Sequence, residues 1–317
     1  GTNYFKVKLG HAPGHPDWPN KLNFRILRHA KGNSLSLVVE GPPNYAFNEY
    51  FQSWSYDGKN WQPIHWENGY QKSPELDSLI FPTFTKDQVY CGTQVPLSYE
   101  KLKGMIEQWR SSPYMKVHII GQSIHGRNLY RLEITDDDSK HPREDRWVHY
   151  FANQHPGEHN SQWRMIGMIQ WLLSDEATEF RKRSVCHFIP MMSPDGPSRG
   201  WYRVNAEGVD MNRSYRPEGA DSTEQAHEAY LCQRDLEQIM NSKTPVTSLW
   251  SMHTWQGPVE PLLRRGPEIG KKVAEWTEFR DIIRSHDPDT LIEDLDIREG
   301  VPGYGYVSWS AGPHKQF

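Results

Sequence analysis

The sequence changes character at Ser98, and this change constrains the fold more than any other feature of the chain. Before it, short runs that alternate apolar and polar residues are separated by turns. These runs cover residues 34–40, 52–56, 60–64, 78–81 and 88–92. Asp57-Gly58 lies between two of the runs and is typical of a β-hairpin. We therefore expect residues 1–97 to form a small all-β sandwich domain.

After Ser98 the pattern becomes one of alternating helices and buried strands. Apolar residues recur at helical spacing up to Arg110, which predicts a first helix there. Further strands are predicted at 147–152 and 185–192, and further helices at 161–173 and 222–240. The last helix is expected to open on a capping box formed by Ser222 and Gln225. This alternation predicts an α/β domain over residues 98–317, with helices on both faces of a sheet.

Charge and hydropathy exclude two classes of partner. Lys plus Arg number 36 against 40 Asp plus Glu, so no basic excess is available to neutralise nucleic-acid phosphates. The mean hydropathy is −0.81, and no apolar run reaches the length of about 18 residues that a membrane helix needs. The compartment stays open because Gly1 opens the chain: the cytoplasm is favoured, and the periplasm or secretion after signal removal are alternatives. The oligomeric state is also open.

The three cysteines do not form a recognisable site. Cys91, Cys186 and Cys232 are far apart and show no CxxC spacing. This argues against a disulfide framework and against a thiolate zinc site. We interpret all three as buried apolar residues.

The segment His155-Pro156-Gly157-Glu158 directly follows the predicted strand 147–152. Open α/β sheets place their sites at this carboxyl end of the strands. Imidazole and carboxylate are zinc ligands, and an i, i+3 pair on a turn can reach one ion. With His159 the string also matches the inverted HxxEH motif, but that motif needs a continuous helix, which Pro156-Gly157 opposes. His159 is therefore interpreted as a residue on the surface or behind the ligands.

Two later segments place polar residues close to strand ends. Residues 188–196 read as a strand that ends in a turn, and Arg203, Asn212 and Arg213 follow it. Two guanidiniums and an amide can grip a carboxylate. The apolar run 248–252 also ends in a histidine, His253, and a lone histidine at such a position is usually structural.

The order of these motifs resembles the carboxypeptidase A family of zinc metallocarboxypeptidases. That family shows HxxE, NPDG, an Arg before DxNR, and a strand that ends in a third ligand His. The matching positions here are His155 with Glu158, Ser193-Pro-Asp-Gly196, Arg203, Asp210-Met-Asn-Arg213 and His253. Residues 121–127 with 132–134 look like the family's GxSxxGR strand-turn-strand. The β-rich start and residues 88–102 are similar to the cytosolic carboxypeptidase branch, which carries a β-sandwich before its catalytic domain.

The resemblance implies a fold, a cofactor and a reaction. Residues 98–317 would form a three-layer α/β/α catalytic domain with a mixed sheet. One zinc ion per chain would be held by His155, Glu158 and His253, and metal-activated water would hydrolyse the C-terminal peptide bond of peptides or proteins. The expected partners are thus peptide or protein C-termini.

The resemblance also assigns roles to individual residues. Arg203 would be the catalytic cation that polarises the carbonyl. Asn212 and Arg213 would bind the terminal carboxylate, and Asp210 would accept a hydrogen bond from the His155 ring. Tyr304 is the candidate for the family's substrate-capping tyrosine, with Tyr306 as the alternative.

Two departures from the family pattern lead to further expectations. Ser193 stands where the family usually has Asn. The family's general-base glutamate is expected a few residues after Trp309-Ser310, and this places it just beyond Phe317. We therefore expect the natural chain to continue, and the chain as given to bind zinc but to turn peptides over slowly. Two alternatives stay open: an aspartoacylase-like zinc deacylase, and a non-catalytic zinc- or peptide-binding module.

Overall fold

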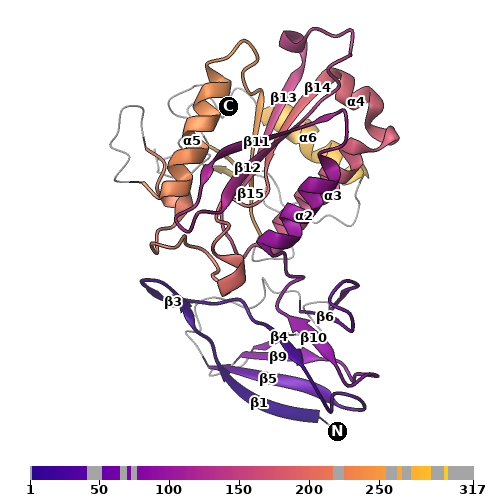
Figure 1. Cartoon of the computed structure of the whole chain (residues 1–317), viewed down its shortest axis with the longest axis vertical. Coiled ribbons are helices and arrows are strands. Elements are labelled where there is room, and N and C mark those ends of the chain that lie inside the picture. The colour runs from indigo at the N-terminus through magenta and orange to yellow at the C-terminus, as the bar shows by residue number, and fades with distance from the viewer. Residues whose placement is uncertain are drawn as a thin grey trace.

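A computed structural model describes residues 2–40, 52–64, 70–72, 77–216, 225–254, 263–265, 273–286 and 296–298. The β-rich N-terminal part lies at one end of the molecule, and a five-stranded sheet flanked by helices lies at the other (Figure 1). The predicted α/β class with a β-rich start is confirmed. The division into domains at residue 97 stays a prediction. Within the described residues, every helix is too short or too polar to cross a membrane.

The N-terminal part contains two four-stranded sheets. The first has the order β1 (Thr2–Lys8), β5 (Ser34–Glu40), β9 (Asp77–Phe81) and β8 (Tyr70–Lys72). The second has the order β4 (Asn23–Ile26), β10 (Val89–Gly92), β6 (Ser53–Ser55) and β7 (Gln62–Pro63). β6 pairs antiparallel with β7, so the hairpin predicted at Asp57-Gly58 is confirmed. One apolar core packs between the sheets, with Leu79 from the first and Cys91 from the second fully buried.

Strands before residue 34 were not predicted from the sequence. β1 pairs in parallel with β5, yet six of its seven residues are exposed. A strand with so little burial shows no alternating pattern for a sequence to reveal. A separate hairpin of β2 (His11–Ala12) and β3 (His15–Pro19) was also missed.

The second part is built on a five-stranded mixed sheet with the order β11-β12-β14-β13-β15. Its strands are β11 (Met115–Gln122), β12 (Asn128–Ile134), β13 (Trp147–Asn153), β14 (Ser184–Ile189) and β15 (Ser248–Met252). β13 runs parallel to both of its neighbours, β14 and β15, whereas β11 and β12 pair antiparallel. The carboxyl ends of the three parallel strands β14, β13 and β15 therefore meet at one edge of the sheet.

Helices cover both faces of this sheet, as predicted. Figure 1 shows α5 (His227–Met240) on one side and α2 (Tyr99–Trp109) and α3 (His159–Leu173) on the other. Alternation along β13 divides its side chains between the two cores: Tyr150 packs with α5, and Phe151 packs with α2 and α3. The shorter elements are α4 (Thr178–Arg183), β16 (Leu263–Arg265), α6 (Val273–His286) and β17 (Asp296–Arg298), with 3₁₀ turns at Arg143–Asp145, Asp175–Ala177, Pro197–Arg199 and Met211–Arg213.

Helix starts agree with the sequence in one case and not in another. Ser98 caps α2, and its side chain accepts a hydrogen bond from the Lys101 N–H. The capping box predicted for α5 is wrong, because the helix begins at His227 with Ala226 as its N-cap. The Gln225 side chain instead donates to Gln233 inside the structure. β14 also ends three residues before the predicted boundary, at Ile189.

The cysteine interpretation is confirmed. Cys91, Cys186 and Cys232 are buried free thiols. Burial raises the pKa of each thiol to about 12, so they stay protonated and unreactive at neutral pH.

Candidate metal centre

Two parallel neighbouring strands deliver the predicted histidine ligands. His155 comes two residues after β13, and His253 comes directly after β15. The strands are in register with Asn153 opposite Met252, so their carboxyl ends coincide. Glu158 stands at the N-cap of α3, at the end of the loop that leaves β13. The topology thus brings residues 98 positions apart in the sequence into contact.

The candidate ligand atoms converge on one point. Nδ1 of His155 lies 3.2 Å from Nδ1 of His253. The Glu158 carboxylate lies between them, with Oε1 at 2.9 Å from His155 Nδ1 and Oε2 at 3.0 Å from His253 Nδ1. His155 and Glu158 are buried and His253 is partly exposed. One side of the cluster is therefore open to an incoming ligand.

An acidic residue behind the cluster fixes the His155 ring. His155 Nε2 donates to Asp210 Oδ1 at 3.1 Å, and this leaves the lone pair of the imidazole on Nδ1, facing Glu158 and His253. The other oxygen of Asp210 accepts from Arg203 Nε at 2.7 Å. Asp210 therefore connects the candidate ligand to the candidate catalytic cation.

The candidate substrate-binding residues follow Asp210 on the short 3₁₀ turn. The Asn212 N–H donates to Asp210, and the Asn212 amide lies 3.3 Å from His253 Nε2. The Arg213 side chain is exposed, with Nη1 donating to the Asn212 carbonyl. Tyr304 and Tyr306 lie outside the described residues.

Both acidic residues of the centre stay ionised. Burial by itself would raise the pKa of Glu158, but His155 and His253 beside it hold that pKa well below its usual range. Burial acts in the same direction on Asp210, where His155 and Arg203 overcome it and lower the pKa. At neutral pH the centre therefore offers one carboxylate as a ligand and a second as a hydrogen-bond acceptor.

His159 takes no part in the ligand cluster, and it is buried instead of lying on the surface. Its Nδ1 pairs with Gln162, and its backbone N–H donates to Gln94 of the segment that precedes α2. Burial lowers the pKa of His159 to about 4, so the ring is neutral at physiological pH. It joins the start of α3 to the chain segment that leaves the N-terminal part.

The ligand loop, residues 154–158 between β13 and α3, is held by two close approaches. A Cβ at Gly157 would lie 2.7 Å from Tyr202 Cα, and the Gly157 N–H donates to the Tyr202 carbonyl. A Cβ at Gly196 would lie 2.4 Å from Pro156 Cβ. Only glycine fits at these two positions, which explains their place in the HPGE and SPDG motifs.

We expect Gly157→Ala to displace the ligand loop. The added methyl group meets backbone, so His155 and Glu158 must shift, and zinc affinity should fall about 10-fold to 100-fold, as for other changes behind metal ligands. Competition with a fluorescent chelator measures this affinity. Gly167→Ala in α3 is the matched control, because nothing lies within 4 Å of a Cβ added at Gly167 and Ala favours a helix. Equal affinities of the two variants would contradict the close approach.

Asp195 of the SPDG turn joins this turn to the GxSxxGR motif. Asp195, in the turn after β14, is fully buried. Its carboxylate accepts from the Ser123 hydroxyl at 2.9 Å, the His125 N–H at 3.1 Å and Arg127 Nη1 at 2.7 Å. The GxSxxGR turn between β11 and β12 is thus tied to the SPDG turn, which packs on the ligand loop.

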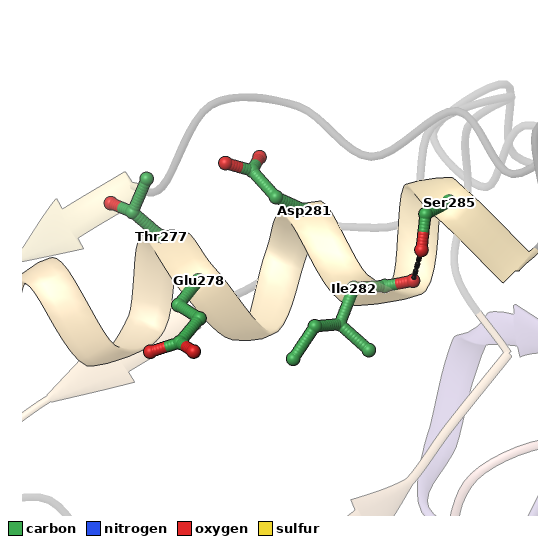
Figure 2. Close-up of a pocket in the computed structure, with 5 residues that line it drawn as sticks. All are labelled: Thr277, Glu278, Asp281, Ile282 and Ser285. Atoms are coloured by element: carbon green, nitrogen blue, oxygen red, sulfur yellow. Dashed lines mark hydrogen bonds between the residues drawn. The ribbon is translucent and has the colours of Figure 1, made fainter.

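A hollow of about 560 Å³ along α6 does not belong to this centre. The described residues that line it are Thr277, Glu278, Asp281, Ile282 and Ser285, all from one helix (Figure 2). The Ser285 hydroxyl donates to the Ile282 carbonyl. This set holds carboxylates but no imidazole, and it contains none of the candidate ligands.

The donor set of the centre fits a zinc ion. Two imidazole nitrogens and a carboxylate are the ligands of open, catalytic zinc sites. All three ligand atoms lie within 4.8 Å of one another, close enough to share one ion. Nε2 of His253 lies 2.8 Å from the Ser251 hydroxyl, an acceptor that leaves Nδ1 free to bind metal. His155 meets the same condition through Asp210.

Comparison with known proteins agrees with this geometry. Residues 105–252 match the family model described as zinc carboxypeptidase. Cytosolic carboxypeptidase 2 of Danio rerio is 35% identical over 153 residues, which are 46% of this chain and 21% of the relative. An uncharacterised protein of Zymomonas mobilis is 27% identical over 195 residues, 59% of this chain and 48% of the relative. The chain thus spans about a fifth to a half of these relatives.

Solved structures share the fold. A metallo-carboxypeptidase from Burkholderia cenocepacia superposes with a TM-score of 0.74 at 18% identity, covering 93% of this chain and 77% of that one. A metallo-carboxypeptidase from Pseudomonas aeruginosa gives 0.72 at 21% identity, covering 99% and 81%. The chain therefore shares the fold of the metallocarboxypeptidases. The similarity to zinc carboxypeptidases over residues 105–252, and to the cytosolic carboxypeptidases among them, is confirmed.

Proposed function

We propose that this protein is a zinc-dependent carboxypeptidase that hydrolyses the C-terminal peptide bond of peptides or proteins. The observation that carries the proposal is the convergence of His155, Glu158 and His253, with Asp210 and Arg203 directly behind them. These five residues come from three separate segments of the chain. The family match and the shared fold support the same reading.

His155, Glu158 and His253 would hold the metal. A zinc ion bound in this way acts as a Lewis acid and makes a coordinated water more acidic. Asp210 keeps His155 in the tautomer that can bind metal. Glu158 is committed to the ligand cluster and is not a candidate for the general base.

Arg203 would act on the scissile carbonyl. Asp210 contacts Nε alone, and the guanidinium has two further nitrogens that can donate to a carbonyl oxygen. A fixed positive charge at this position stabilises the negative charge that develops on that oxygen during attack. Arg203 is thus proposed as the catalytic cation.

Asn212 and Arg213 would make the enzyme an exopeptidase. They lie beside His253 on the turn that begins at Asp210. An amide and a guanidinium together match the geometry of a terminal carboxylate.

Tyr304 is proposed to cover the bound substrate. Residues 1–97 are proposed as a β-sandwich domain without a metal of its own, and residues 98–317 as the catalytic domain. The name of the cytosolic relatives favours the cytoplasm.

A paired substrate assay tests the proposed function. We expect the zinc-loaded protein to release the last residue from a peptide with a free C-terminus and to leave the C-terminally amidated peptide intact. Mass spectrometry of the products measures both. Faster hydrolysis of an N-acyl amino acid than of the free peptide would support the deacylase alternative, and bound zinc without any turnover would support the binding module.

A further inference from the structure

The β2–β3 hairpin of the N-terminal part packs directly on the segment that carries Arg203 and Asp210. Ala12, Trp201 and Val204 form a buried apolar cluster with Trp18 at its edge. His15 Nε2 donates to the Gly208 carbonyl at 2.6 Å. A Cβ at Gly208 would lie 2.4 Å from the Pro13 carbonyl oxygen, so the two segments touch backbone to backbone.

The segment under the hairpin is a tight loop with the two charged residues at its ends. Val204 and Asp210 form an antiparallel bridge, and the loop between them turns at Gly208, whose φ is +79°. This closure places Arg203 beside Asp210, where their side chains pair. The position of Arg203 therefore depends on the loop that the hairpin covers.

Trp18 contacts the guanidinium itself. The Arg203 Cζ lies over the Trp18 ring, 5.6 Å from its centroid. His15 stacks on Trp18 with ring centroids 4.1 Å apart and planes 13° from parallel, which fixes the indole in place. Arg203 is mostly buried. Its guanidinium is thus held by two contacts of different kinds, a carboxylate at Nε and an aromatic ring over its plane.

We propose that Trp18 is a positioning residue for Arg203, supplied to the active site by the N-terminal part of the chain. This inference rests on the proposed function for its catalytic consequence. Asp210 fixes one edge of the guanidinium but does not fix its rotation about that hydrogen bond. The Trp18 ring restricts this rotation and so aims the two terminal nitrogens of Arg203.

The kinetic test compares Trp18→Leu with Trp18→Phe in the zinc-loaded full chain. Leu keeps apolar volume but removes the ring, and a cation–π contact is worth about fivefold to tenfold in rate. We expect Trp18→Leu to lower kcat by that factor with KM changed less than about twofold, and Trp18→Phe to recover most of kcat. Trp54→Leu is the control, because Trp54 packs on Tyr56 and Phe84 of the same part of the chain.

A double-mutant cycle separates positioning from a structural role. In an Arg203→Lys background, Trp18→Leu should lower kcat by less than about twofold, because the planar group that the ring orients is gone. An unchanged effect of Trp18→Leu in that background would overturn the proposal. So would an equal loss of kcat in Trp54→Leu.

A second readout does not depend on activity. The readout is the NMR resonance of the Arg203 Nε–H proton, which is assigned by its absence in Arg203→Lys. The ring current of Trp18 should shift this resonance upfield. The shift should disappear in Trp18→Leu and persist in Trp18→Phe. If the unmodified protein hydrolyses no peptide, the proposed function fails, and this spectrum still decides whether Trp18 holds Arg203. A resonance that is the same in Trp18→Leu would reject the contact.

Discussion

His155→Ala is expected to abolish stoichiometric zinc binding, the largest effect that a single substitution should have in this protein. His155 is one of the three proposed protein ligands, and it is also the one that Asp210 orients. A structural zinc site of four ligands is worth roughly 10–16 kcal/mol. One ligand therefore accounts for about 3 kcal/mol, or roughly a 100-fold loss of affinity. Peptidase activity should fall to background with the metal.

Zinc content after dialysis against a weak chelator, measured by elemental analysis, checks this result. His149→Ala is the matched control, since His149 lies on β13, the strand that leads to His155, but pairs with Ser248 and not with the ligand cluster. The control should keep one zinc per chain. Stoichiometric zinc in His155→Ala would refute the assignment of the centre.

Arg213→Ala is expected to raise KM for peptides with a free C-terminus by about 100-fold. A charged, bidentate contact to a carboxylate is worth about 3 kcal/mol when one partner is removed. The Arg213 side chain is exposed, and among the described residues it donates only to the Asn212 carbonyl, so the fold should not change. Arg213→Lys should recover part of the loss, because a point charge replaces the fork.

Steady-state kinetics on matched free and amidated peptides measure the effect. Arg234→Ala is the control, because Arg234 is an exposed arginine on α5 whose ion pair with Glu237 lies away from the centre. Its KM should stay within about twofold of the unmodified protein, as expected for a surface ion pair. An Arg213→Ala variant with an unchanged KM would show that the terminal carboxylate binds elsewhere.

The ligand loop could be predicted from the sequence because its signal is local. His155 and Glu158 are three residues apart, directly after a strand with a strong apolar pattern. His253, at the end of β15, could be named as a ligand only through the resemblance of the ordered motifs to a known family. The sequence alone did not contain the pairing of β13 with β15, which makes the two strand ends coincide. That pairing had to come from the order of the motifs and their resemblance to a known family.

The features that could not be predicted depend on long-range contacts. Ser222 and Gln225 have the spacing of a capping box, yet Gln225 pairs with Gln233 and the helix begins at His227. Nothing near Trp18 indicates that it contacts Arg203, which is 185 positions later in the chain. Local patterns report the burial of a residue, but they do not report its partner.

The two strand ends that carry His155 and His253 have a consequence for the unfolded chain. An ion shared by these two residues, which are 98 positions apart, would close a long loop, as a disulfide does. By chain entropy, a cross-link around a loop of about 100 residues is worth on the order of 4–5 kcal/mol. The melting temperature of the protein should therefore rise with the concentration of free zinc. Chelation of the metal would remove this cross-link reversibly. The free energy of unfolding would then depend on how much zinc is available to the protein.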